Sequence, residues 1–474
     1  MASEHCLPFH PARIPVARSD TATQRREACW YFFYRLTSML PAIAIVLMVV
    51  PIARQFLNVW LTVTVFAVWV FFAVILRPSW PLQLTRCLYV VPLWLAYAFC
   101  EAMRVGMDDR FLGGFVLFLA PAFIYDYYRK NRGILAMLIT VGISSFLAGS
   151  IMSVKVLWVS PLAARLVSTN WVISPAYSYL GHSGVGDFRF TYGVAMLAPL
   201  VVAIAAGTGR AKWLRVSMVV CACVFAYYLY LAAFAMSIYI VIAGTFMAVL
   251  FHIKRLPLKA AASLLTVVAG LLFLVFGADL MLFVARNVNS EVLSIKARAA
   301  ASLLPGGQHT KEGQFASDRI SLYGISYKTF LEHPIMGVGA YYSVAGVDVG
   351  LEHGIGAHSD LLDNLARYGL IGAGLYLPIL FMLAFRAASE WRGTAYGRTA
   401  LAMWVLFFLM CCSNPVSGQT EVGVSVFLLW PALPKVFAAR GTAPPNVNGR
   451  QLRSAPNPHG RKENREGCDE MAGV

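Results

Sequence analysis

Long apolar runs separated by short charged segments make up most of this chain. A helix that crosses a bilayer needs about 20 mostly apolar residues, and about 12 stretches approach that length. Their ranges are 36–53, 56–76, 87–103, 111–128, 133–153, 190–208, 213–233, 235–251, 260–280, 369–388, 399–413 and 421–438. The stretch from 213 to 251 fits either two tightly turned spans or one span and a buried segment. The pattern predicts an all-α, polytopic integral membrane protein.

The segments between and beside these spans define the predicted organisation. Residues 154–189 and 281–368 are long and more polar, and we expect both to be extracytoplasmic loops, the second between spans 9 and 10. The parts are a disordered tail at 1–35, spans 1–9 within 36–280, the large loop at 281–368, spans 10–12 within 369–438, and a second disordered tail at 439–474. The last tail is rich in Pro, Gly, Asn and charge, and cannot bury a core.

Composition and charge agree with a membrane protein and set its orientation. The chain is 59% apolar and 13% charged, with a mean hydropathy of +0.65. Its net charge of +16 does not indicate a nucleic-acid partner, because Lys and Arg concentrate in alternate loops, as in the cytoplasmic loops of membrane proteins. We therefore place basic segments such as 129–132 and 254–259 in the cytoplasm. Both tails are predicted to be cytoplasmic, and the two long loops to face the other side.

Polar side chains concentrate in residues 317–376, a long run in which Arg, His, Asp, Glu and Gly occur together. Ser317 can cap a helix that Pro334 ends, with Arg319 in its first turn. The apolar residues of this helix fall on one stripe, namely Ile320, Tyr323, Tyr327, Phe330 and Leu331. The spacing predicts an amphipathic helix with Arg319 off its apolar stripe.

A glycine-rich passage leads to a second predicted helix. Gly337 and Gly339 indicate a tight turn at which the backbone approaches its neighbours. They are not a nucleotide-binding fingerprint, because no strand precedes them. Ser359 can cap the second helix, and Gly369 can end it just before the next span. His358 then stands immediately outside the N-terminus of that helix, at the edge of the membrane.

These residues resemble the motif of a known family, the bacterial O-antigen ligases and O-antigen or exopolysaccharide polymerases. Its members are polytopic proteins whose largest extracytoplasmic loop carries an arginine, a His-Pro-x-x-Gly-x-Gly turn and then a histidine before the next helix. Arg319 matches the arginine, HPIMGVGAYY from His333 matches the turn, and His358 in HSDLLDNLARYGLIG matches the histidine. The chain departs from the pattern at Ser359, where Asn is common, and at Met236-Ser237-Ile238, where many members carry Ser-Arg.

The resemblance implies a glycosyltransferase that takes its glycan from undecaprenyl diphosphate and uses neither a metal ion nor a cofactor. It implies His358 and Arg319 as catalytic residues, with Arg319 also binding the diphosphate. A departing lipid diphosphate develops negative charge that an arginine stabilises, and a histidine can take the proton of an acceptor hydroxyl. The implied location is a bacterial inner (plasma) membrane, with the site facing the periplasm. The implied partners are the bilayer, the lipid-linked glycan, a chain-length regulator and a flippase.

Three further residues are candidates for the same site. Arg189, in GDFRFTYG before the sixth span, is a candidate second ligand of the diphosphate. The alternative is an arginine that snorkels to the lipid headgroups. Asp360 and Asp363 are candidates for orienting His358. The alternatives are a first-turn acid favoured by the helix dipole and an ion pair with Arg367.

Neither a metal site nor a disulfide framework is expected. The large loop contains His309, His353 and His358 with several acids, but it has neither an HxxxH pair nor a cysteine partner. The nine cysteines all lie in predicted spans or tails. Paired cysteines that would brace the exposed loops are therefore not expected.

Three functions remain open from the sequence. The first is a polymerase that transfers the growing glycan onto a lipid-linked repeat unit, which the HSDLLDNLARYG version of the motif favours. The second is a ligase that transfers the glycan to lipid A core or to a protein. The third is a flippase or exporter of lipid-linked oligosaccharides. A transporter is expected to bury charge near the bilayer midplane, whereas the acids Glu101, Asp126 and Asp279 lie near predicted span ends.

Overall fold

The computed structural model describes residues 21–437, with gaps at 58, 106–108, 170–182, 208–211, 254–255, 289–290, 304–313, 340–354, 357 and 392. Every regular element in that part of the chain is helical. Seven of its helices are long and apolar enough to cross a membrane. The predicted fold class, an all-α polytopic membrane protein, is therefore confirmed.

The helices are α1 (Thr21–Val49), α2 (Pro51–Phe56), α3 (Val59–Leu76), α4 (Val90–Val105), α5 (Asp109–Tyr128), α6 (Arg132–Val159), α7 (Ala163–Thr169), α9 (Phe188–Ala206), α10 (Lys212–Ala232), α11 (Ala235–His252), α12 (Leu256–Asn287), α13 (Glu291–Leu303), α14 (Gln314–Glu332), α15 (Asp360–Glu390), α16 (Ala395–Ser413), α17 (Thr420–Gly423) and α18 (Trp430–Phe437). Short 3₁₀ turns precede α4. A π-helical segment, Val424–Leu429, joins α17 to α18.

Each apolar helix long enough to cross a membrane coincides with a predicted span. The seven long apolar helices are α3, α6, α9, α10, α11, α15 and α16, and shorter apolar stretches lie at Arg35–Val49 and Val90–Glu101. The ambiguous stretch 213–251 forms two helices, α10 and α11, separated by a turn in which Ala233 has a φ of 54°. The count of about 12 spans stays a prediction.

Two boundaries differ from the sequence-based expectation, and one helix is additional. The tail predicted to be disordered to residue 35 is helical from Thr21, because α1 continues the first span backwards through polar residues. The large loop, predicted to begin at 281, begins later, because α12 runs to Asn287. The additional helix α13 then lies within the loop. The hydrophobic pattern locates the apolar part of a helix, but it does not show how far the helix continues into polar residues at either end.

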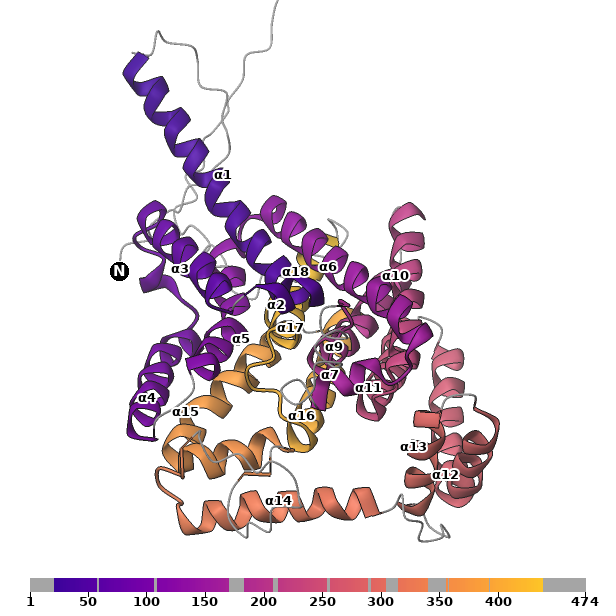
Figure 1. Cartoon of the computed structure of the whole chain (residues 1–474). Helices are drawn as coiled ribbons and strands as arrows, with labels where there is room; N and C mark the ends of the chain where they lie inside the picture. The colour runs from indigo at the N-terminus through magenta and orange to yellow at the C-terminus, as the bar shows by residue number, and fades with distance from the viewer. Residues whose placement is uncertain are drawn as a thin grey trace, which may run out of the picture.

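The most buried span is α9, which lies among α10, α11, α16 and α17 (Figure 1). Nearly all its residues from Phe190 to Ala205 are buried. The last helix packs against it, and Trp430 Nε1 donates a hydrogen bond to Met196 O at 3.1 Å. This packing brings the N-terminus of α9 against the N-terminus of α17, where the charged groups described below meet.

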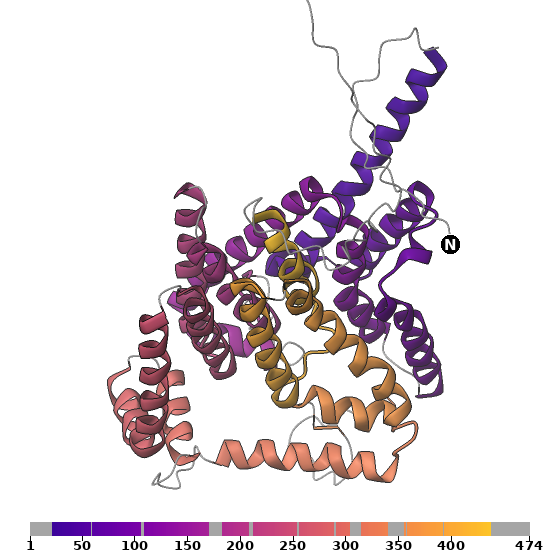
Figure 2. The ribbon, with the colours of Figure 1, turned by 180° about the vertical axis from the view of Figure 1, so that it is seen from behind.

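Charged residues gather at two opposite ends of the bundle. At one end Arg386 lies 3.4 Å from Asp126 and 2.9 Å from Glu390, which also pairs with Lys435 at 3.0 Å. These residues belong to ends predicted to be cytoplasmic. A second charged group, Arg54 with Asp187 and Glu421, lies where α2, α9 and α17 meet, and α14 runs along one edge of the molecule in both views (Figures 1 and 2). The orientation of the spans across the membrane stays a prediction.

Candidate functional site

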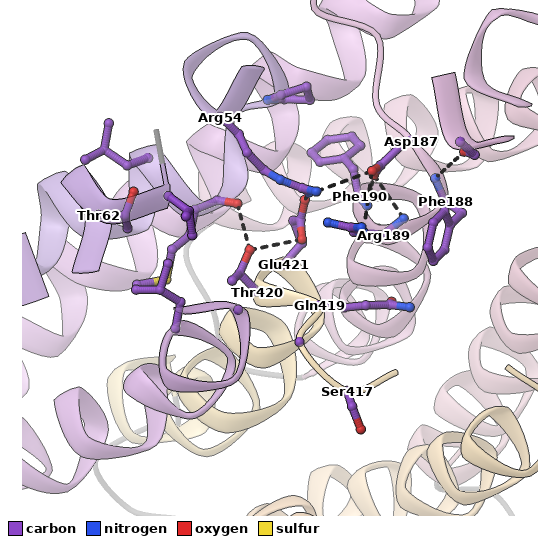
Figure 3. Close-up of a pocket in the computed structure, with 18 of the residues that line it drawn as sticks. Arg54, Thr62, Asp187, Phe188, Arg189, Phe190, Ser417, Gln419, Thr420 and Glu421 are labelled. Carbon is purple, nitrogen blue, oxygen red and sulfur yellow. Dashed lines mark hydrogen bonds and ion pairs between the residues drawn. The ribbon is translucent and has the colours of Figure 1, made fainter. Parts of the chain in front are cut away.

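A cavity of about 790 Å³ lies between α2, the start of α9 and residues 415–421. Its wall comes from the ends of α1 and α3, from α2, from the start of α9, from α15 and from residues 415–421 (Figure 3). The charged residues in the wall are Arg54, Asp187, Arg189, Arg367 and Glu421. Three arginines face two carboxylates, so the cavity carries one net positive charge. Such a site favours an anionic ligand.

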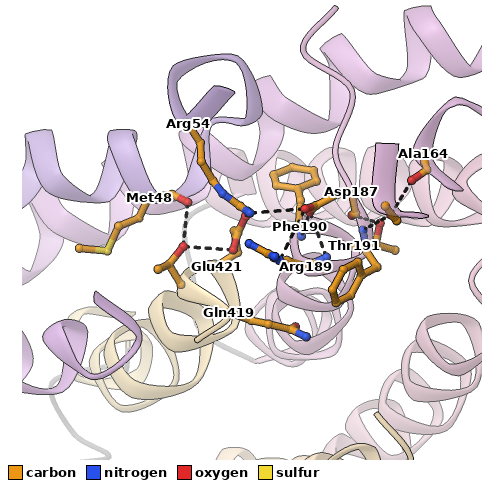
Figure 4. A network of polar contacts seen from close by, with 12 residues as sticks. Met48, Arg54, Ala164, Asp187, Arg189, Phe190, Thr191, Gln419 and Glu421 are labelled. Atoms are coloured by element: carbon orange, nitrogen blue, oxygen red, sulfur yellow. Dashed lines mark hydrogen bonds and ion pairs between the residues drawn. The ribbon is translucent and has the colours of Figure 1, made fainter. Parts of the chain in front are cut away.

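Arg54 in α2 links two of the helix ends around this cavity. It forms an ion pair with Glu421, a side chain only 2% exposed, and lies 3.4 Å from Asp187 (Figure 4). Burial alone would lower the pKa of Arg54, but Glu421 and Asp187 raise it above its ordinary value. The guanidinium therefore stays charged in the cavity wall. The sequence analysis did not propose Arg54; the available signal was a lone arginine between the first two spans.

Asp187 caps α9 and places Arg189 in the cavity wall. Asp187 Oδ1 accepts hydrogen bonds from the backbone N of Arg189 at 3.0 Å and of Phe190 at 3.2 Å. The Nε of Arg189 lies 3.8 Å from Asp187 Oδ2, and the Arg189 side chain is 44% exposed. Burial alone would raise the pKa of Asp187, but the charges of Arg54 and Arg189 outweigh it and lower the pKa. The candidate residue Arg189 thus lies in the cavity, held at its base by a carboxylate.

Asp360 fixes the opposite wall. Its Oδ1 accepts hydrogen bonds from the backbone N of Val416 at 3.1 Å, the backbone N of Ser417 at 2.8 Å, and the Ser417 hydroxyl. Asp360 is only 2% exposed. This first-turn acid, proposed from the sequence as an orienting group for His358, therefore contacts residues 416–417 and holds that segment against the head of α15.

His358 lies just before α15 and is half-buried. Its Nδ1 is 2.7 Å from the carbonyl oxygen of Gly356. A carbonyl oxygen only accepts, so Nδ1 carries a proton. In the neutral tautomer this leaves the lone pair on Nε2, where the ring can accept a proton. Among the described residues, His358 is not part of the cavity wall, although it lies two residues before Asp360, which holds that wall.

A chain of hydrogen bonds holds the backbone around His358. The Ser326 hydroxyl, on α14, donates to Asp363 Oδ1 at 2.7 Å and accepts from the backbone N of Gly356 at 2.8 Å. Asp363 Oδ2 accepts from the backbone N of Ser359 at 3.1 Å. The carbonyl oxygen of Gly356 in turn accepts a hydrogen bond from Nδ1–H of His358. Asp363 thus holds the backbone on both sides of His358, and Ser326 was not among the residues proposed from the sequence.

The helix α14 carries Arg319 and begins earlier than predicted. Ser317 lies inside it and is not its N-cap, because the helix starts at Gln314. Arg319 is therefore in the second turn, and its side chain lies outside the described residues. Since Ser326 of the same helix binds Gly356, α14 and His358 lie at the same end of the bundle. The predicted end of the helix at Glu332 is confirmed.

The apolar stripe predicted for α14 is mostly exposed, although the Tyr323 hydroxyl donates a hydrogen bond to the carbonyl oxygen of Ser413 at 3.4 Å. Among the side chains of α14 that the structure describes, the buried ones are Leu322, Ser326 and Thr329. Ile320 and Leu331, on the predicted stripe, are 68% and 56% exposed. The buried face of α14 thus contains a hydroxyl group, that of Ser326, which binds the loop at Gly356.

The glycine turn and the helix kink form one junction. Gly337 and Gly339 have φ values of 72° and 86°, and the N of Gly339 donates to the carbonyl of Arg367 at 2.8 Å. A Cβ on Gly337 would lie 2.4 Å from that carbonyl carbon. Gly369 interrupts α15 with a φ of 59°. Ser359 caps the helix, and its side chain accepts from the N of Leu362 at 3.3 Å. The predicted tight turn, break and cap are all present.

The structure describes one of the three loop histidines that were considered for metal binding. His309 and His353 lie outside the described residues, while His358 makes the contact with Gly356 given above. Within the described part of the chain, no group of three or more His, Cys, Asp and Glu residues could hold a metal ion. The positive groups that the structure brings together at this site are arginines.

Comparison with known proteins bears on the segment that carries the motif. Residues 227–377 match the family model described as O-antigen ligase. The matched range contains α14, the glycine turn and the head of α15 with His358. No curated protein matches the chain in sequence.

Proposed function

We propose, on the premise that this chain belongs to the family of O-antigen ligases and O-antigen or exopolysaccharide polymerases, that it transfers a glycan from undecaprenyl diphosphate to a lipid-linked repeat unit. The family assignment made from the motif is confirmed by the match, and the chain is a membrane protein of the glycosyltransferase type. The donor, the acceptor and the residues that act on them are the substance of the proposal.

The cluster of arginines in the cavity carries this proposal. Arg54 and Arg189 are held near each other by Asp187, and Arg367 lies in the same wall. A diphosphate has acceptor oxygens that suit the planar, always charged guanidinium. The carboxylates hold Arg54 and Arg189 in place, so an anion can bind the remaining guanidinium N–H donors without moving either side chain. Arginine charge can stabilise the leaving diphosphate without a divalent cation.

The proposed reaction is a single displacement at the sugar. The acceptor hydroxyl oxygen attacks C1 of the donor glycan, and the bond from C1 to the diphosphate oxygen breaks. Undecaprenyl diphosphate leaves with the bonding electron pair, and its charge is taken up by the arginines, with Arg319 as a further ligand. The proton of the acceptor hydroxyl passes to Nε2 of His358, whose lone pair is available because Nδ1–H binds Gly356.

Two observations bear on the acceptor. The sequence HSDLLDNLARYG around His358 resembles exopolysaccharide polymerases, which favours a lipid-linked repeat unit as acceptor. The family model that matches is described as O-antigen ligase, which favours lipid A core or a protein. Polymerisation is the function proposed here, and ligation is the second candidate.

The location proposed for the reaction is the periplasmic face of the bacterial inner membrane. The charged groups at the cavity all belong to ends that the Lys and Arg pattern assigns to the outside. The opposite cluster around Arg386 and Glu390 belongs to ends assigned to the cytoplasm. A flippase would deliver the donor to this side, and a chain-length regulator would act on the product.

The decisive experiment is incubation of the purified protein in liposomes with lipid-linked repeat units alone. Longer lipid-linked chains are expected, and a His358→Ala protein should form none. Product that appears only when a core acceptor is added would replace polymerase with ligase. Translocation of the lipid-linked units without any new bond would refute both and favour the transporter.

A further inference from the structure

Gln419 occupies a restricted position in the cavity wall. It is the residue before α17, is 3% exposed, and lines the cavity together with Arg189 and Ser417. Figure 3 draws its side chain in the wall that also holds Arg189. A polar side chain this deeply buried normally has all its hydrogen-bonding groups paired.

Of the two polar atoms of the Gln419 amide, Nε2 has a hydrogen-bond partner and Oε1 has none among the described residues. Its Nε2 donates to the carbonyl oxygen of Pro415. Because that carbonyl can only accept, the amide nitrogen must face it, and the orientation of the amide is fixed. Oε1 is then directed away from Pro415 and has no hydrogen-bond partner among the described residues. The wall of the cavity therefore holds a buried acceptor that requires a donor.

Hydrogen bonds fix the segment that carries Gln419, so Oε1 cannot find a partner through movement of the backbone. Asp360 binds the backbone N of Val416 and of Ser417. The backbone N of Gln419 donates to Val416 O at 3.1 Å, and its carbonyl accepts from Gly423 N at 3.0 Å. Gly418 supplies the φ of 78° that the turn needs. The acceptor is thus held at one place beside the cavity.

We propose that Gln419 Oε1 accepts a hydrogen bond from a hydroxyl group of the sugar attached to the donor diphosphate, so that Gln419 recognises the glycan. This inference rests on the function proposed above. Phosphate oxygens are acceptors and would be repelled by Oε1, so the diphosphate itself cannot satisfy it. Sugar hydroxyls are donors, and the first sugar is bonded directly to the diphosphate. A site that binds phosphate through Arg189 brings such a hydroxyl to the same wall.

The test measures binding of two probes to the purified full-length protein in nanodiscs. The probes are undecaprenyl diphosphate without sugar and the same lipid carrying the repeat unit. Gln419→Leu is expected to weaken binding of the glycosylated lipid about 5–15-fold, the worth of one hydrogen bond to an uncharged group. Binding of the bare diphosphate lipid should stay within about twofold. The matched control Arg189→Gln, in the same wall, should weaken both lipids.

The outcomes separate this inference from the function on which it rests. Equal weakening of both lipids by Gln419→Leu, or no weakening of either, would overturn the role of Gln419 while leaving the donor site in place. Failure of the wild-type protein to bind either lipid would overturn the proposed function and this inference with it. Gln419→Met, which keeps the length of the side chain, and thermal unfolding of each variant guard against collapse of the segment. The same selective loss is expected from Gln419→Met.

Discussion

Ser326 offers the sharpest test of how the fold prepares His358. The Ser326→Ala change removes a fully buried hydroxyl that joins Gly356 N to Asp363 Oδ1. Two buried groups are left without a partner, each at a cost of about 1–3 kcal/mol. With partial relaxation of the loop, we expect a loss of about 2–4 kcal/mol at this junction. Since Gly356 also holds the imidazole, part of that loss appears as displacement of His358.

The expected kinetic effect follows from the place of Ser326 in the molecule. It lies outside the arginine cavity, so KM for the lipid-linked donor should stay within about twofold. If about 1.4–2.8 kcal/mol of the local loss reaches the reacting geometry, kcat falls about 10–100-fold. The assay is transfer by reconstituted protein over a range of donor concentrations. The matched control is Ser217→Ala on α10, where the exposed hydroxyl bonds only within its own helix and the change should be neutral.

A second variant tests whether Ser326 and Asp363 act as one unit. If they do, Asp363→Asn combined with Ser326→Ala should cost little more kcat than the worse single change, because each change breaks the same chain of hydrogen bonds. Full additivity, or a fall in donor affinity that matches the fall in kcat, would refute the positioning role. An unchanged kcat in Ser326→Ala would refute it outright.

Three further predictions concern the cavity and the junction beside it. Arg189→Lys keeps the charge but loses the planar fork, so KM for the donor should rise about tenfold; an unchanged KM would remove Arg189 from the donor site. Gly337→Ala places a Cβ 2.4 Å from the Arg367 carbonyl carbon at a φ of 72°, and should lower the free energy of unfolding by about 2–4 kcal/mol. The control Gly374→Ala, with open space around it, should not, and equal thermal unfolding of the two variants would contradict the account. Because the pKa of Asp187 is lower folded than unfolded, its stabilisation is present above about pH 4 and is lost as pH falls through the folded pKa. Asp187→Asn should therefore be less stable than wild type at pH 7, with the difference shrinking below pH 4; a constant difference would show that the charge of Asp187 contributes nothing.

Local chemistry could be predicted from the sequence. The cap at Ser359, the break at Gly369 and the tight turn at Gly337 and Gly339 depend on side chains and backbone angles within a few residues. The placement of the spans depends on local hydropathy in the same way. The exception was Ser317, because a serine that can cap a helix is also tolerated within one, and α14 begins at Gln314.

The contacts that assemble the site could not be predicted in this way. Arg54 meets Glu421 across 367 positions of sequence, and Ser326 meets Asp363 across 37. No pattern in one sequence states which helix ends will be neighbours. Nothing in the sequence therefore distinguished Arg54 from other basic residues beside a span, or Gln419 from other polar residues before the last span.

Product formation from purified lipid-linked repeat units, measured for wild-type and His358→Ala protein together with donor binding on the same samples, decides whether His358 is catalytic. Wild-type protein is expected to lengthen the glycan and release undecaprenyl diphosphate, while His358→Ala should bind the donor normally and form no product. Full activity in the His358→Ala protein, or no product from the wild type with either acceptor, would contradict this expectation.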